Sequence, residues 1–402
     1  MPADVRIMTN RRLLLVTRQY PAHDALYRYP FVHRRVLAYQ ERGVPVDVFS
    51  LSGSRELSSY VFDGVTCLTG DIETLREFIA RRCYPVIAVH GLSRHMWPAL
   101  AQHAEKGRRL TGWIHGSELH PLFRHDRRPD NEAVIARKER EHARNIEFWR
   151  ELLARPPRGL HLVFMSSHAR QDAERELGAP LPSGRIHILP NPIDTKLFSY
   201  RPKPPEQRFR ILTIRPFDAA FYANDISVKV IQLLNGGEFA SRLSFHVIGD
   251  GPLFEKTLAP LRGMSNVRIE RRFLEQREIA RLHRENGIFL VPTRMDTHGV
   301  SRDEAMSSGL VPATCPVAAV PEFTCGDCAI LAPPDRPGDL AEGITDILRD
   351  PGIFAAKSRA AAKKVRATAA AGRVIPQELE LLGWSGAPDR RERARNRGEA
   401  AG

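Results

Sequence analysis

The sequence predicts an α/β protein built from two doubly wound, Rossmann-like domains that face a central cleft. Short apolar runs alternate with helical patterns along most of the chain, which is typical of parallel sheets with crossover helices. The 402 residues exceed one ordinary hydrophobic core. A proline-rich segment at 191–208 separates two such series, because proline is disfavoured in helix interiors and central strands.

The first series predicts an acceptor-side domain over residues 1–190. Helical patterns fill the intervals between its strands, and the longest runs from Asp130 to Arg155, with charges that indicate a solvated face. The expected strands are 12–16, 44–50, 86–90, 110–115, 161–166 and 185–189.

The second series predicts another domain over residues 209–350, followed by a helical segment at 351–384. The tail at 385–402 is basic and poor in apolar residues, so we expect it to be disordered. Doubly wound domains bind ligands at the carboxyl ends of their strands, so the cleft between the domains is the expected ligand site. The expected strands are 209–214, 243–249, 266–272, 287–292, 310–314 and 329–332.

Basic residues exceed acidic ones by 60 to 47, which gives a net charge of +13. This excess favours anionic partners such as nucleotides, nucleic acid or the cytoplasmic face of a membrane. Aromatic residues make up 7% of the chain and no run interleaves them with arginines, which argues against a specific nucleic-acid partner.

The apolar runs and the cysteines of the sequence indicate the expected location and redox state of the protein. No apolar run is long enough for a signal peptide or a spanning helix, so we expect a cytoplasmic protein, with peripheral contact at the inner face of the membrane left open. Five scattered cysteines do not form a disulfide framework, and we expect free thiols.

The stretch MDTHGVSRDEAMSSG, residues 295–309, holds the most specific pattern. It reads as a strand end, a loop and a short helix that Gly309 stops. Backbone amides at 299–301 would then favour a phosphate at the helix start. Glu304 could accept both hydroxyls of a ribose, and Asp296 could reach a second sugar. Alternatively, Ser301 and Glu304 form a capping box, and Glu304 only satisfies its own helix.

The longer segment VPTRMDTHGVSRDEAMSSGLVP resembles the signature of retaining glycosyltransferases of family 4, the group 1 transferases of GT-B architecture. Their E-x7-E motif ends in EAM-x-x-G, and here the first acid is Asp296, one methylene shorter. HVIGDGP (246–252) is similar to the family's G-D-G-P turn and ILPNPID (188–194) to its inter-domain segment. The resemblance covers roughly residues 12–350 and is strongest after 185.

The resemblance implies a donor site with stated roles. Glu304 would hold the ribose of the nucleotide, Asp296 would contact the transferred sugar, and the backbone of Gly299, Val300 and Ser301 would hold the diphosphate. The implied donor-binding set is Arg215, Asp250, Gly251, His298, Gly299, Val300, Ser301 and Glu304. No D-x-D pair stands at a strand end, so we expect neither a metal nor a cofactor besides the nucleotide sugar.

The family's usual G-R-x5-K-G pattern, whose arginine and lysine neutralise the diphosphate, is only half present. Arg215 is suited to a bidentate phosphate contact. No lysine stands at the expected position, and Lys229 falls part way along a predicted helix.

The first domain would supply the facing wall of the cleft. His115, at the end of the strand in LTGWIHGSELH, is similar to the family histidine that contacts the donor sugar, although a histidine there is often a structural hydrogen bonder. His90 and Arg94 are candidate acceptor contacts. An inverting enzyme would instead need a base, with Glu118 or His120 as candidates.

The resemblance therefore implies a hexosyltransferase-type enzyme that moves a sugar from a nucleotide diphosphate to a hydroxyl on a glycan or lipid-linked acceptor, with retention, in polysaccharide or glycolipid synthesis. Two alternatives stay open. One is another reaction on the same scaffold, such as a sugar-nucleotide epimerase or a phosphorylase. The other is a catalytically silent, basic module that binds RNA or membrane, which predicts steep salt dependence without nucleotide-sugar selectivity.

Overall fold

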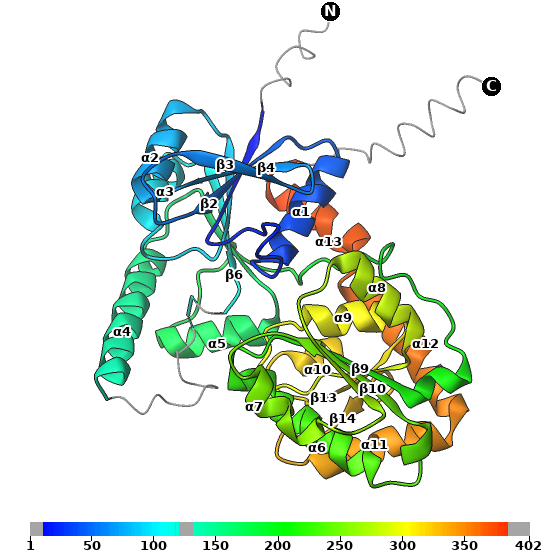
Figure 1. Cartoon of the computed structure of the whole chain (residues 1–402). Coiled ribbons are helices and arrows are strands. Elements are labelled where there is room, and N and C mark those ends of the chain that lie inside the picture. The colour runs from blue at the N-terminus through cyan, green and yellow to red at the C-terminus, as the bar shows by residue number, and fades with distance from the viewer. Residues whose placement is uncertain (1–10, 117, 120–131, 385–402) are drawn as a thin grey trace, which may run out of the picture.

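The computed structural model describes residues 11–116, 118–119 and 132–384, which form two α/β domains (Figure 1). Each domain has one sheet with helices packed on both faces, so each contains two layers of hydrophobic core. The central strands are continuous apolar runs because both of their faces are buried, as β1 (LLLVT) illustrates with five buried residues.

The described part of the first domain contains an eight-stranded sheet in the order β3-β4-β2-β1-β5-β6-β7-β8. Every neighbouring pair is parallel except β3 with β4. The strands are β1 (Leu13–Thr17), β2 (Val46–Leu51), β3 (Ser58–Phe62), β4 (Val65–Gly70), β5 (Val86–His90), β6 (Arg109–Ile114), β7 (Leu160–Phe164) and β8 (Ile186–Ile188).

The second domain has a six-stranded parallel sheet in the order β11-β10-β9-β12-β13-β14. This order reverses between β9 and β12, which is the point where doubly wound sheets bind their ligands. The strands are β9 (Arg210–Ile214), β10 (Ser244–Gly249), β11 (Val267–Arg271), β12 (Ile288–Leu290), β13 (Val311–Thr314) and β14 (Ile330–Leu331).

Thirteen α-helices are present in the described residues, and those between strands are crossover connections. They are α1 (Pro30–Glu41), α2 (Ile72–Arg81), α3 (Trp97–Glu105), α4 (Glu132–Ala154), α5 (Ser167–Leu177), α6 (Asn224–Asn235), α7 (Phe254–Leu258), α8 (Gln276–Glu285), α9 (Val300–Ser307), α10 (Val320–Phe323), α11 (Pro337–Arg349), α12 (Pro351–Thr368) and α13 (Ala371–Leu381).

A strand appears at each of the twelve predicted places, with ends that differ by a few residues. The sequence prediction missed the hairpin of β3 and β4, which adds an antiparallel edge to the first sheet. Its turn is Asp63-Gly64, where both residues have positive φ. An Asp-Gly pair between alternating apolar residues is a standard hairpin signal, so this element was detectable.

The last helix, α13, lies against α1 of the first domain rather than against the domain that precedes it in the chain (Figure 1). Its apolar residues Ile375 and Leu379 belong to the core of the first domain. The contact also contains an ion pair of Arg35 with Glu378, 3.0 Å apart, in which both side chains are fully buried. The helical segment predicted at 351–384 therefore spans both domains.

Other sequence-based expectations concern local features. The helix predicted at 130–155 is α4 in its described part. The tail at 385–402, predicted to be disordered, lies outside the described residues. All five cysteines are free thiols, as expected. Among the described residues, no helix combines the length and the apolarity needed to cross a bilayer.

Candidate active site

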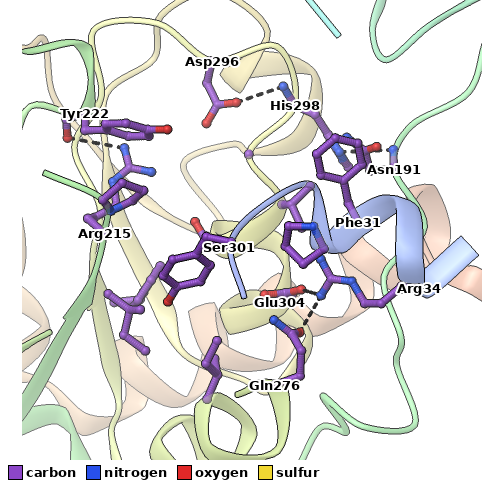
Figure 2. A pocket seen from close by; sticks show the side chains of 18 of the residues that line it. Phe31, Arg34, Asn191, Arg215, Tyr222, Gln276, Asp296, His298, Ser301 and Glu304 are labelled. Carbon is purple, nitrogen blue, oxygen red and sulfur yellow. Dashed lines mark hydrogen bonds and ion pairs between the residues drawn. The ribbon is translucent and has the colours of Figure 1, made fainter. Parts of the chain in front are cut away.

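A cavity of about 360 Å³ lies between the two domains, against the carboxyl ends of β9 and β12. Residues of α1 and the end of β6 line it from the first domain. Residues of the linker, β9, α8 and the β12–α9 loop complete its wall. The predicted pair Asp296 and Glu304 both line this cavity, which Figure 2 shows in close-up.

The start of α9 has the geometry of an anion site. Gly299 is the N-cap residue, its φ is 90°, and no side chain caps the helix. The positive φ favours glycine, and a Cβ at Gly299 would also lie 2.5 Å from Nη1 of the buried Arg302. The first-turn amides, including those of Val300 and Ser301, therefore stand at the cavity with the positive end of the helix dipole.

Glu304 is buried at the cavity wall and pairs with a residue of the other domain. Its Oε1 accepts a short hydrogen bond from Nη1 of Arg34, which also donates to Oε1 of Gln276 at 2.5 Å. Figure 2 shows Arg34 reaching both residues. Burial raises the pKa of Glu304, and Arg34 opposes that shift. The capping-box alternative is wrong, because Gly299 is the N-cap and the Glu304 carboxylate binds Arg34 instead of helix amides.

Asp296 lies on the loop between β12 and α9. Its Oδ1 accepts the backbone N–H of His298 at 3.0 Å, which fixes the loop. The next residue, Thr297, donates its hydroxyl to the carbonyl of His115 at 3.2 Å and so ties the loop to the first domain. Asp296 and Glu304 thus stand on either side of the helix start that separates them in sequence.

His298 is buried at 1% exposure. Nδ1 accepts the backbone N–H of Asn191 at 3.2 Å, and Nε2 lies 3.1 Å from Oδ2 of Asp303. Burial would raise the pKa of Asp303, but Arg302 and His298 outweigh it and lower that pKa. His298 lines the cavity, and its imidazole holds the loop against the linker.

Arg215 follows β9 and lines the cavity with 6% exposure. Its Nη2 donates to the carbonyls of Pro292 at 3.0 Å and Tyr222 at 3.4 Å. The buried Nε finds no acceptor among the described residues. Burial lowers the pKa of Arg215, and Asp296 opposes that change. Lys229 lies within α6, as predicted, and is exposed away from the cavity lining.

Asp250 and Gly251 do not line the cavity, in contrast to the donor contact predicted from the G-D-G-P turn. The Asp250 carboxylate accepts from Nε of Arg271 at 2.7 Å, and this pairing lowers the pKa of Asp250. Gly251 has a φ of 144°, and a Cβ there would lie 2.5 Å from the carbonyl carbon of Phe217. The two residues shape the turn after β10.

His115 lines the cavity from the first domain, as the sequence predicted. Its Nε2 lies 3.1 Å from Nδ1 of His90, and burial lowers the pKa of His115 to about 3. The imidazole is therefore neutral near pH 7. His90 has no exposed surface and stacks on Trp113, so the acceptor contact predicted for His90 is wrong.

The remaining first-domain candidates lie off the cavity. Oε2 of Glu118 accepts the backbone N–H groups of His115 at 3.0 Å and Gly116 at 2.8 Å. Burial raises the pKa of Glu118. Glu118 and Arg94 line a neighbouring cavity of about 400 Å³ in the first domain. His120 lies outside the described residues.

Sequence reasoning missed the contribution of α1, which brings Phe31 and Arg34 into the cavity, and of α8, which brings Gln276. No local motif marks these residues. Their spacing of three places Phe31 and Arg34 on one helix face, but only the domain arrangement shows where that face points. Among the described residues, no group of three or more His, Cys, Asp or Glu side chains is placed to share a metal ion.

Three comparisons with known proteins show which family model and which solved structures this chain resembles. Residues 211–350 match the family model described as glycosyl transferases group 1. No curated protein matches the chain in sequence. Among solved structures, sucrose-phosphate synthase from Thermosynechococcus elongatus is 14% identical, with a TM-score of 0.70, and the match covers 92% of this chain and 98% of that chain.

Two other structures extend the comparison. Anabaena HepE, solved in complex with UDP and glucose, is 13% identical, with a TM-score of 0.66, and the match covers 93% of this chain and all of that one (100%). TarM of S. aureus, solved with UDP among its ligands, is 12% identical, with a TM-score of 0.58. That match covers 78% of this chain but 59% of TarM, so this chain spans less than two thirds of TarM. The chain has the predicted GT-B architecture, and its second domain contains the match to the group 1 glycosyltransferase model.

Proposed function

We propose that the chain is a glycosyltransferase that moves a sugar from a nucleoside diphosphate donor to a hydroxyl acceptor, with retention at the anomeric carbon. One observation carries the proposal. Asp296 and Glu304 line a single inter-domain cavity on either side of an uncapped helix start, and Arg215 belongs to the same lining. Carboxylates suit sugar hydroxyls, and the helix start suits a phosphate.

The donor would occupy the cavity along α9. Its ribose hydroxyls would donate to Glu304, and its diphosphate would accept from the amides at 299–301 and from Arg215. Asp296 would hold the transferred sugar next to His115. Because the pKa of His115 is about 3, this histidine would act as a neutral hydrogen-bonding group and not as an acid.

The proposed reaction breaks the bond from the anomeric carbon to the donor phosphate oxygen and forms one to the acceptor oxygen. Negative charge develops on the leaving diphosphate, so fixed amides and Arg215 would stabilise the transition state more than the ground state. The acceptor proton would pass to a phosphate oxygen on the same face. No divalent metal takes part in this scheme.

The test is a transfer assay after a thermal-shift screen of UDP- and GDP-sugars. We expect one nucleotide series to raise the melting temperature, and product NMR to show the anomeric configuration of the donor. Activity that survives EDTA would support the metal-free scheme. A product of inverted configuration would refute retention.

The same assay separates the competing functions. An epimerase would return an isomerised nucleotide sugar, and a phosphorylase would release a sugar phosphate. A silent binding module would show steep salt dependence on RNA or anionic vesicles and no preference among nucleotide sugars.

The acceptor and the location of the protein stay predictions. The net charge of +13 favours an anionic glycan or a lipid-linked acceptor and peripheral contact with the inner face of a membrane. Cosedimentation with anionic vesicles, compared with neutral vesicles, measures that contact directly.

A further inference from the structure

We infer that Arg34, on the first helix of the first domain, is a second cation for the donor diphosphate and that Glu304 holds it in position at the cavity wall. The inference rests on the proposed function, because it assumes a nucleoside diphosphate in the cavity. It adds a contact from the opposite domain that no local sequence motif indicates.

The position of Arg34 is the first support. Its side chain is 16% exposed and lines the cavity. Within the described residues, both of its hydrogen bonds are made by Nη1, to Glu304 and Gln276. The Nε atom is buried and has no acceptor there. A guanidinium has five N–H donors in a planar fork, and the two on Nη2 make no hydrogen bond within the described residues, so they stay available for an anion.

The charge balance of the cavity is the second support. Its lining holds two arginines, Arg34 and Arg215, and two acids, Asp296 and Glu304. The charges of the two acids and the two arginines cancel, so the lining has no excess positive charge from these four side chains. Both arginines are therefore needed to neutralise a bound diphosphate. Arg215 already uses its Nη2 on two backbone carbonyls. A diphosphate ester carries a negative charge on each phosphate, and one arginine neutralises only one of them.

The reach of the side chain is the third support. Glu304 follows Ser301 by three residues on α9, so their Cβ atoms are about 5–6 Å apart. A guanidinium that touches Glu304 therefore lies about one helical turn from the amides proposed for the diphosphate. When ribose hydroxyls donate to Glu304, they compete with Arg34 for its lone pairs. The freed donors of Arg34 then turn to the neighbouring phosphate.

A different role for the same ion pair predicts the opposite result. If the pair were a latch that keeps nucleotides out, removing Arg34 would strengthen nucleotide binding. If it served only domain packing, removing Arg34 would weaken UDP and UMP binding by the same factor. The diphosphate contact alone predicts a loss specific to the second phosphate.

The experiment is isothermal titration of the full chain with UDP and UMP, and with GDP and GMP, using the base that the wild type prefers. The variants are Arg34→Ala and Arg34→Lys, and the control is Arg42→Ala, which removes the same charge from the end of α1 outside the cavity. Melting curves establish that each variant is folded. The ratio of diphosphate to monophosphate affinity is the readout, because effects on Glu304 and on the ribose cancel in it.

We expect Arg34→Ala to lower that ratio by about tenfold or more, the usual range for a hydrogen bond to a charged group. Arg34→Lys should give an intermediate ratio, and Arg42→Ala should match the wild type. An unchanged ratio, or tighter UDP binding in Arg34→Ala, overturns the inference and leaves the proposed function intact. A wild type that binds none of the four nucleotides overturns the proposed function, and this inference falls with it.

Discussion

The change Glu304→Gln removes the charge of one carboxylate and keeps its shape, so it isolates the role proposed for this acid. Glu304 is 4% exposed and bonded to Arg34, which also contacts Gln276. Glutamine retains one acceptor oxygen, and Gln276 continues to accept from Arg34. We therefore expect the folded structure to persist, with a loss of unfolding free energy of at most about 1–3 kcal/mol.

The same change should have a clearly measurable effect on nucleotide affinity. Hydrogen bonds to a charged group contribute about 1.5–3 kcal/mol, so the loss of the carboxylate should weaken nucleotide binding by about 10- to 150-fold. Isothermal titration with the preferred nucleoside diphosphate measures this change. Glu342→Gln is the matched control, because Glu342 is an exposed glutamate on α11 of the same domain.

The pH dependence of binding tests the same acid. Burial raises the pKa of Glu304, with Arg34 opposing the shift. Nucleotide affinity of the wild type should fall as the pH drops through that raised pKa, because the protonated acid is a poorer acceptor. Stability has the opposite sign, since the contribution of a raised carboxyl pKa is present at low pH and is lost as the pH rises through it. Glu304→Gln should lack both dependences, and wild-type affinity in that variant would refute the ribose contact.

Further predictions concern the loop, the helix start and the domain contact. Asp296→Asn should leave nucleotide affinity unchanged and lower the transfer rate by about 100-fold or more, since its contact is proposed for the transferred sugar; equal losses of binding and rate would contradict this division of roles. Gly299→Ala should weaken nucleotide binding because φ is 90° and a Cβ would displace the guanidinium of the buried Arg302 beside the helix start, whereas Gly263→Ala, at a φ of 86° with open space around it, should keep binding and lose only about 1 kcal/mol of stability. Glu378→Gln should cost about 3–5 kcal/mol of unfolding free energy in urea titrations, because its partner Arg35 is fully buried; a cost under about 1 kcal/mol would mean that water reaches the pair.

Much of the fold could be predicted from the sequence because the central strands are continuous apolar runs. The position of Gly299 at the helix start could also be predicted, since a strand followed by a glycine and a short helix is a local pattern. The sequence-based prediction missed the β3–β4 hairpin because its strands are amphipathic and short, and residues such as Val61 are exposed. Its Asp63-Gly64 turn was the signal that would have found it.

The parts of the site that sequence reasoning missed depend on contacts between distant segments. The bond from Arg34 to Glu304 joins residues 270 positions apart, so no window of sequence contains both. Local pattern also allowed a wrong partner, because Ser301 and Glu304 have capping-box spacing. Asp250 has a local motif as well, but its carboxylate pairs with Arg271 on the next strand, and Asp250 does not line the cavity.

The return of α13 to the first domain bears on how the protein can be dissected. A cut at the proline-rich linker would yield a first domain with a solvent-exposed apolar groove and an orphaned Arg35, since the helix that fills both would remain on the other fragment. Chimaeras that exchange the first domain between proteins of this architecture should therefore transplant two segments, residues 11–190 together with 371–382, as one unit.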